Sequence, residues 1–210
     1  MRKSLKLTET VRMNRRLILS AIVLVLAAAG AAAQDALHVF VERLGSAPAA
    51  FEYSFASHGG NAPLAGSGRA SIAGDCYRIV GDGLDIRCDG SARWTADPAA
   101  GEMVIEPVDS HTLDFVSNPV MIFRDLDTCF SSEEVSRGVF VLTPHCSDNG
   151  IDKLSISFSS NGAPCAAKLS MSDGSVADFT ISGFVFGATE EPYSFSKTDL
   201  KAYRNVTDLR

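Results

Sequence analysis

The chain has 210 residues, of which 46% are hydrophobic, and its 25 Asp and Glu outnumber its 19 Lys and Arg to give a formal net charge of −6. Such an acidic chain lacks the clustered basic residues that phosphate contacts require, which excludes non-specific nucleic-acid binding. The length fits one domain with a sizeable core.

The N-terminal segment has the three zones of a secretory signal peptide. Basic residues precede an apolar stretch of thirteen residues, Leu17 to Ala29, and three alanines ending at Ala33 close the segment. Thirteen residues are too few to span a bilayer, so we expect cleavage after Ala33 rather than an uncleaved anchor, with Met13 a candidate true start.

Removal of residues 1–33 would take away six basic residues and one acidic residue. The remaining 177 residues then carry 13 Lys and Arg against 24 Asp and Glu, a net charge of −11. No cysteine stands at the cleavage site to carry a lipid. We therefore predict a single soluble domain, residues 34–210, exported to the periplasm.

A helix should open this domain, because its apolar residues recur at positions i, i+3, i+4 and i+7. Asp35 is its expected N-cap and Gly45 its expected end. The apolar face comprises Leu37, Phe40, Val41 and Leu44.

Strands follow, because apolar and polar residues alternate in short runs that end at turns. Roughly ten such runs lie between residues 51 and 186, with a hairpin turn at Asp89-Gly90 and another turn at Asp173-Gly174. This pattern predicts a mainly β (α+β) fold, a curved antiparallel sheet or barrel. The tail, residues 197–210, is polar, and we expect it along the sheet edge.

The stretch from Ser117 to Phe123 breaks this alternation. Five non-polar residues follow an Asn-Pro step, Ser117 or Asn118 can cap a helix, and Pro119 suits its first position. A short apolar helix among strands is either a core plug or a lid.

The five cysteines leave at least one thiol unpaired. Cys76 and Cys88 flank the expected turn at 81–83 and could face each other across a hairpin, and Cys129 and Cys146 could form a second disulfide. Their spacings match no zinc pattern, so buried thiols or structural disulfides are favoured over a metal site. The fifth is Cys165.

Motifs of catalysis are missing from the sequence. It contains no Gly-x-Ser-x-Gly elbow, no His-Glu-x-x-His and no phosphate loop. His145 beside Cys146 is the one close pair that suggests a nucleophile, and neighbouring residues on a strand point to opposite faces. The adjacent carboxylates, such as Glu133 and Glu134, lie in polar segments and read as solvated charge. We predict that the protein is not an enzyme and uses no cofactor or metal.

Several stretches, in order, match a known family. "CDGSARWTADPAAGEMVI" (88–105) resembles the Asp-Gly-x-x-x-Trp-x-x-x-Pro hairpin of the outer-membrane lipoprotein carriers, the LolA family, and "SNPVMIF" (117–123) resembles their Asn-x-Pro lid helix. "FVLTPHCSDNGIDKLSISF" (140–158), "MSDGSVADFTI" (171–181) and the closing Asp208-Leu209-Arg210 also resemble family segments. The resemblance covers the chain from about residue 35 to its end.

The resemblance implies an unclosed β-barrel whose apolar concavity takes the acyl chains of lipoproteins beneath helical lids. It also implies three partners: acylated lipoproteins as cargo, an inner-membrane ABC-type transporter that releases them, and an outer-membrane acceptor. The carrier is expected to be a monomer. The alternative is a lipid-sensing envelope-stress regulator of the same fold, and those proteins usually add a second domain.

One departure concerns the lid. Family carriers latch it with an arginine in an Arg-Pro step, where this chain has Gly74-Asp75. Arg78 is a candidate replacement, but the resemblance does not transfer the role to it.

Alternation and the resemblance together predict the site. The lid would be Asn118, Pro119, Val120, Met121, Ile122 and Phe123. A dry core packed against the two helices is the competing interpretation for about half of the residues assigned to the concave face, and a slip of one residue would invert a whole strand. Those residues are Phe51, Tyr53, Phe55, Ile72, Ile79, Ile86, Trp94, Met103, Ile105, Phe140, Leu142, Ile156, Phe158, Leu169 and Met171.

Overall fold

The structure is a computed structural model that describes residues 36–59, 63–108, 119–123, 126–127, 129–145, 150–188 and 192–210, without the side chains of Pro119 and Met121. The predicted signal peptide, its cleavage site, Asp35, Asn118 and Cys146 lie outside this part of the chain. Within it, no helix is both long and apolar enough to cross a membrane.

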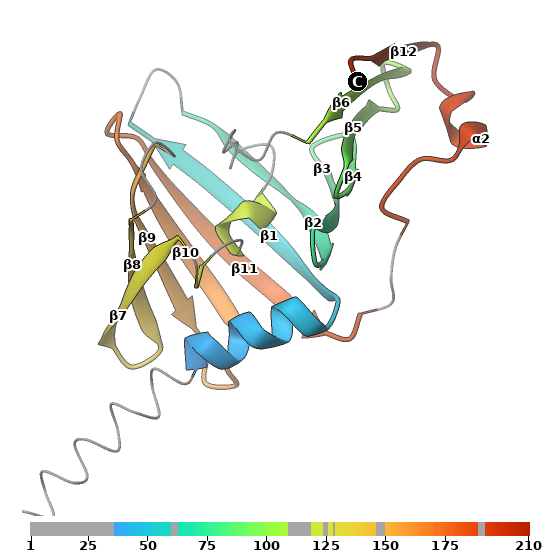
Figure 1. Cartoon of the computed structure of the whole chain (residues 1–210). Coiled ribbons are helices and arrows are strands. Elements are labelled where there is room, and N and C mark those ends of the chain that lie inside the picture. The colour runs from blue at the N-terminus through green and yellow to red at the C-terminus, as the bar shows by residue number, and fades with distance from the viewer. Residues whose placement is uncertain are drawn as a thin grey trace, which may run out of the picture.

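One curved sheet of twelve strands makes up the fold, in the order β12-β6-β5-β4-β3-β2-β1-β11-β10-β9-β8-β7 (Figure 1). Every neighbouring pair is antiparallel except β12 and β6, which run parallel. The two ends of the sheet, β12 and β7, do not meet, so the predicted curved antiparallel sheet and unclosed barrel are confirmed.

The strands alternate apolar and polar residues as the sequence predicts, and several neighbours, such as β3 and β4 or β4 and β5, are joined by two-residue turns. Their bounds are β1 (Ala49–His58), β2 (Ala65–Ala73), β3 (Cys76–Gly81), β4 (Leu84–Asp89), β5 (Ala92–Asp97), β6 (Glu102–Pro107), β7 (Phe130–Ser136), β8 (Val139–Pro144), β9 (Ile151–Phe158), β10 (Pro164–Met171), β11 (Val176–Phe186) and β12 (Asn205–Asp208).

The turn between β3 and β4 shows how local sequence sets the register. Asp82 and Gly83 both have positive φ, 51° and 83°, as a two-residue hairpin turn with right-handed strand twist requires. The Asp82 carboxylate also accepts a hydrogen bond from the Ser67 backbone N–H at 3.1 Å, which ties the turn to β2.

An N-terminal helix over residues 36–46 crosses the lower end of the curved sheet, near the ends of β10 and β11 (Figure 1). Leu37 and Phe40 on its predicted face are buried, and Val41 and Leu44 pack partly buried beside them. The helix continues one residue past Gly45, where the sequence predicted its end.

The two faces of the sheet carry separate apolar clusters. The concave cluster holds the inward residues of β1–β4 and β8–β11 together with Leu37, Phe40, and Val120, Ile122 and Phe123 of a short 3₁₀ helix, η1 (Pro119–Phe123). The convex cluster holds Ala92, Trp94, Ala96, Met103 and Ile105 of β5 and β6 with Phe195, and Leu200 and Tyr203 pack against it.

The C-terminal strap, residues 192–210, covers the convex cluster. It contains a one-turn helix, α2 (Lys197–Leu200), and then β12, which extends the sheet as an edge strand. The prediction that the tail follows the sheet edge is confirmed for β12. The tail is not simply polar, however, because Leu200 and Tyr203 pack against Trp94 and its neighbours.

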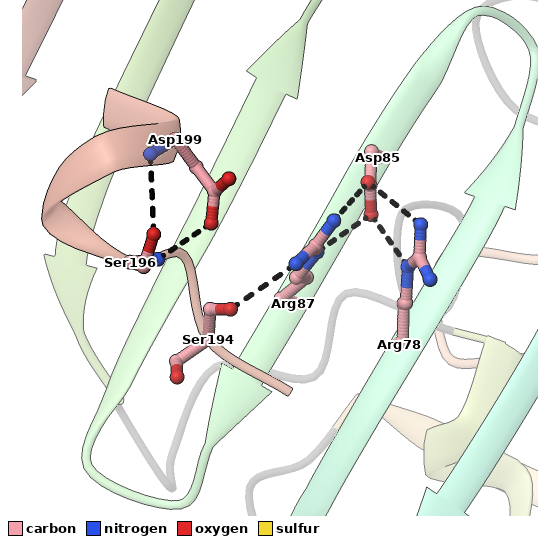
Figure 2. Close-up of polar contacts among 6 residues, drawn as sticks. All are labelled: Arg78, Asp85, Arg87, Ser194, Ser196 and Asp199. Atoms are coloured by element: carbon pink, nitrogen blue, oxygen red, sulfur yellow. Dashed lines mark hydrogen bonds and ion pairs between the residues drawn. The ribbon is translucent and has the colours of Figure 1, made fainter. Parts of the chain in front are cut away.

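An ion-pair group on the convex face holds the start of the strap (Figure 2). The Asp85 carboxylate accepts hydrogen bonds from Arg78 at 3.0 Å and from Arg87 at 2.8 Å. Arg87 also donates to the Ser194 carbonyl at 3.1 Å, and its guanidinium lies 3.8 Å from the centre of the Phe195 ring.

The register corrects one predicted cysteine pair. Tyr77 stands opposite Cys88, and Cys76 stands opposite Asp89. Because neighbouring residues point to opposite faces, Cys76 and Cys88 lie on different sides of the hairpin and form no disulfide with each other. Cys88 is a buried thiol.

Candidate functional site

On the concave face lies η1, the short yellow-green coil in front of β1 in Figure 1. Pro119 is its first residue, as predicted, and Val120, Ile122 and Phe123 are 1%, 1% and 3% exposed. The sequence predicted a short helix here, and the structure has a 3₁₀ helix of five residues. Three of its side chains are therefore buried in the concave cluster.

Phe123 joins η1 to the N-terminal helix and the sheet. Its ring centroid lies 5.4 Å from that of Phe40, 5.6 Å from that of Phe51 and 5.9 Å from that of Phe184. All three pairs are edge-to-face, the favourable arrangement of aromatic rings. Phe123 of η1 thus contacts both the N-terminal helix, through Phe40, and the sheet, through Phe51 and Phe184.

A β-bulge places Phe184 in this group. The pairing of β1 and β11 shifts register between Ala50 and Glu52, and Gly183, with φ of 61°, adopts the conformation that such an irregularity needs. The Phe184 ring then stacks on Phe51 with an interplanar angle of 13°. Alternation along β11 does not reveal this position, because the bulge interrupts it.

An open cleft of about 360 Å³ runs between η1, the N-terminal helix and the turn between β2 and β3. That volume is in the range of small-ligand pockets, about 300–1,000 Å³. Polar side chains, namely those of His38, Glu42, Asp75 and Asp127, also border it. Its apolar lining consists of Val41, Leu44, Ile72, Val120, Phe123 and Leu126.

Two tyrosines of the concave face stay protonated at physiological pH. Burial, with a smaller contribution from the nearby Asp82 carboxylate, raises the pKa of Tyr53 to about 12. Burial also raises the pKa of Tyr77 to about 12, with further effects from Cys88 and Arg93. Burial likewise raises the pKa of the Cys88 thiol. These groups are neutral and suit binding better than acid–base chemistry.

Glycines stand opposite two of the aromatic residues on the neighbouring strand. Phe55 is paired with Gly66 and Tyr53 with Gly68. A Cβ added at Gly66 would meet the Phe55 ring at 2.6 Å, and one at Gly68 would meet the Tyr53 hydroxyl at 3.0 Å. The glycines therefore let both side chains lie close to the sheet.

Most of the predicted cavity residues do lie on the concave face. Phe158 and Met171 are partly buried against the concave cluster. Ten others are buried within it: Phe51, Tyr53, Phe55, Ile72, Ile79, Ile86, Phe140, Leu142, Ile156 and Leu169.

The placement of Trp94, Met103 and Ile105 on the concave face is wrong. Trp94 stands opposite Arg87, and Arg87 shares the convex face with Asp85. Alternation along β5 and β6 gives two faces but does not say which is inward. These three residues are buried because the C-terminal strap covers them.

The same register excludes Arg78 as a latch for η1. Arg78 stands opposite Arg87 and bonds to Asp85 on the convex face, whereas η1 lies on the concave face. Gly74 and Asp75, which stand where family carriers have the Arg-Pro step, both line the cleft beside η1.

Sequence reasoning missed several residues of the site. Tyr77 alternates with Ile79 and could have been found from that pattern, whereas Phe40 belongs to the helix face and Phe184 follows the bulge. The buried Phe179 and Ile181 of β11 also belong to the concave cluster.

The described residues offer little for metal or nucleophilic chemistry. No group of three or more His, Cys, Asp or Glu among them is arranged to hold a metal ion. His145 is exposed at the end of β8, and its suggested partner Cys146 is outside the described residues.

Comparison with known proteins gave structural matches and no sequence family. No protein-family model matches the chain, and no curated protein does. Similar solved structures include a DUF1329 family protein from Desulfovibrio piger, with 13% identity, a TM-score of 0.46 and coverage of 81% of this chain and 98% of that one.

Two further solved structures are similar to the chain. A LolA superfamily protein from Nitrosomonas europaea has 12% identity and a TM-score of 0.43, covering 78% of this chain and 97% of that one. The MucA/MucB complex from Pseudomonas aeruginosa contributes a chain with 14% identity and a TM-score of 0.33, covering 76% and 58% respectively.

Proposed function

We propose that this protein is a periplasmic carrier that holds the acyl chains of lipoproteins on its concave face and shuttles them from the inner to the outer membrane. Its partners would be acylated lipoproteins as cargo, an inner-membrane ABC-type transporter and an outer-membrane acceptor. The protein would act as a monomeric chaperone without catalysis. The observation that supports this most is the burial of η1 side chains in the concave cluster beside an open cleft with a partly apolar lining.

Reversible loading requires a competitor for the acyl chains. Burying an acyl chain is favourable by about 0.8 kcal/mol per CH₂. Burial of Val120, Ile122 and Phe123 stabilises the closed state by about 1.5–3 kcal/mol each, or about 4.5–9 kcal/mol together. If cargo displaces these side chains, they offset about six to eleven methylenes of binding. In this proposal η1 sets affinity as well as access.

The test uses spheroplasts that carry radiolabelled lipoprotein. Incubation with the purified protein should release lipoprotein into the supernatant as a soluble complex, as an established carrier does in a parallel sample. No release would contradict the carrier function. Binding of a fluorescent fatty acid without release would instead favour a lipid-sensing regulator of the same fold.

A further inference from the structure

A single row of side chains crosses the concave face from the cleft to β6. The register places Ile72, Tyr77, Cys88, Arg93 and Glu106 opposite one another on β2 to β6. Strands in a sheet are about 4.8 Å apart, so Arg93 is about 14 Å along this row from Ile72, which lines the cleft. A bound chain and its head group could span that distance.

The chemistry of the row changes from one end to the other. Ile72, Tyr77 and Cys88 are buried, at 4%, 5% and 1% exposure. The side chains of Arg93 and Glu106 are each 30% exposed. The concave face therefore passes from a dry apolar floor to a polar margin that solvent reaches.

Arg93 and Glu106 form a neutral pair at this margin. The Arg93 Nε donates to the Glu106 carboxylate at 2.7 Å, and its Nη2 contacts the same oxygen. On the side of the apolar floor, the Tyr77 phenol is close enough to interact with the Cys88 and Arg93 side chains. The group presents guanidinium N–H donors, a carboxylate acceptor and no net charge.

We propose that Tyr77, Arg93 and Glu106 form a polar subsite for the uncharged ester or amide head of an acylated ligand. This inference rests on the proposed function and specifies that the polar margin binds the head group of the ligand. Guanidinium N–H groups donate to carbonyl oxygens, and the carboxylate accepts from amide N–H or hydroxyl groups. A free carboxylate or a phosphate would compete with Glu106 for Arg93, in a chain whose net charge is already negative.

Equilibrium binding of two probes with the same chain tests the proposal: 1-monopalmitoylglycerol, with an uncharged ester head, and palmitate. The protein purified after expression of the full chain should bind the glycerol ester more tightly. Arg93→Met should weaken ester binding about tenfold, because charge-assisted hydrogen bonds are lost. Palmitate affinity should change less than twofold.

Two variants serve as controls. Arg69→Met removes an exposed arginine of β2 on the convex face and should leave both affinities unchanged. Arg93→Met with Glu106→Leu removes the whole pair, so that no unpaired carboxylate remains to disturb folding. The double variant should show the same selective loss for the ester.

Three results would overturn the inference. If the double variant bound both probes with unchanged affinity, or lost affinity equally for both, the polar margin would not recognise the head group. Acyl binding and the carrier function would remain intact. Tighter binding of palmitate than of the ester by the unmodified protein would contradict the preference for an uncharged head. Binding of neither probe would overturn the subsite and acyl binding together.

Discussion

The two apolar clusters of this sheet are covered in different ways. On the convex face the C-terminal strap packs apolar side chains on the sheet and is also held by polar contacts, namely the Arg87 bond to Ser194 and the pairing of β12 with β6. On the concave face, η1 contacts the sheet through apolar side chains. Directional bonds fix one geometry, whereas apolar contacts can be exchanged for others. We therefore expect the strap to be a permanent part of the fold, whereas the proposed function requires η1 to be displaced.

Trp94→Ala should have the largest effect on stability and none on binding. Removal of a buried tryptophan from the convex cluster should lower the free energy of unfolding by about 3–5 kcal/mol. Chemical denaturation measures the loss, and a fluorescent fatty acid measures the affinity of the folded protein. Val104→Ala, on the other face of the same hairpin and partly exposed, should change stability by less than about 0.5 kcal/mol. A weakened affinity in Trp94→Ala would contradict the separation of the two faces.

The same deletion in both covers gives the sharpest comparison. Phe123→Ala and Phe195→Ala should each lower the free energy of unfolding by about 3 kcal/mol. In Phe123→Ala the fatty-acid affinity should also rise, because less of η1 has to be displaced. Phe195→Ala should leave affinity unchanged. Equal affinities in the two variants would mean that η1 is plain core.

The Asp85 group predicts an acid-sensitive strap. Burial opposes ionisation of Asp85, but hydrogen bonds from Arg87 and Arg78 outweigh it and lower its pKa below the ordinary value. A carboxyl whose pKa is lowered by folding adds stability that is complete above the unfolded value of about 3.9 and is lost as pH falls through the folded value. Asp85→Asn should therefore lower the free energy of unfolding by about 1.5–3 kcal/mol at pH 7, because charge-assisted hydrogen bonds from two arginines are weakened, with less loss at acid pH.

Unfolding curves from pH 7 down to pH 2 measure this difference. Glu52→Gln, an exposed carboxylate on the same face of the sheet, is the matched control. A constant difference between Asp85→Asn and the unmodified protein over that range would disprove the linkage.

The smallest effect concerns the cap of α2. Ser196 accepts a hydrogen bond from the Asp199 backbone N–H at 3.2 Å, and Ser196→Ala should lower the free energy of unfolding by about 1 kcal/mol. Ser194→Ala is the control, because Ser194 contacts Arg87 through its carbonyl and not its side chain. Similar losses in both variants would show that the cap does not stabilise the strap.

The sequence was a sound guide to elements and a weaker guide to faces. Leu37 and Phe40, the helical start at Pro119 and the strands from β1 to β4 could be predicted, because periodicity and turn residues are local signals. Trp94 and Ile105 could not be assigned, since alternation is identical whichever face is inward. The tail did carry a signal that it covers the other face of the sheet, namely its apolar residues Phe195, Leu200 and Tyr203.

Long-range geometry accounts for the other misses. The roles of Arg78 and Cys76 depend on register across the β3–β4 hairpin, where one residue of shift moves a side chain to the opposite face. Phe184 reaches the aromatic group only because of an irregularity at Gly183. The pairing between strands decides which face such a side chain occupies, and the sequence of a single strand does not reveal that pairing.

The unjoined edges of the sheet have a mechanical consequence. In a closed barrel, strand number and stagger fix the circumference, so the interior widens only if interstrand hydrogen bonds break. Here β12 and β7 end the sheet separately, and a change in twist distributed over eleven strand pairs would spread or tighten the curve with every ladder intact. If the protein carries acyl chains as proposed, the sheet can adjust its curvature to chains of different bulk while its interstrand hydrogen bonds are conserved.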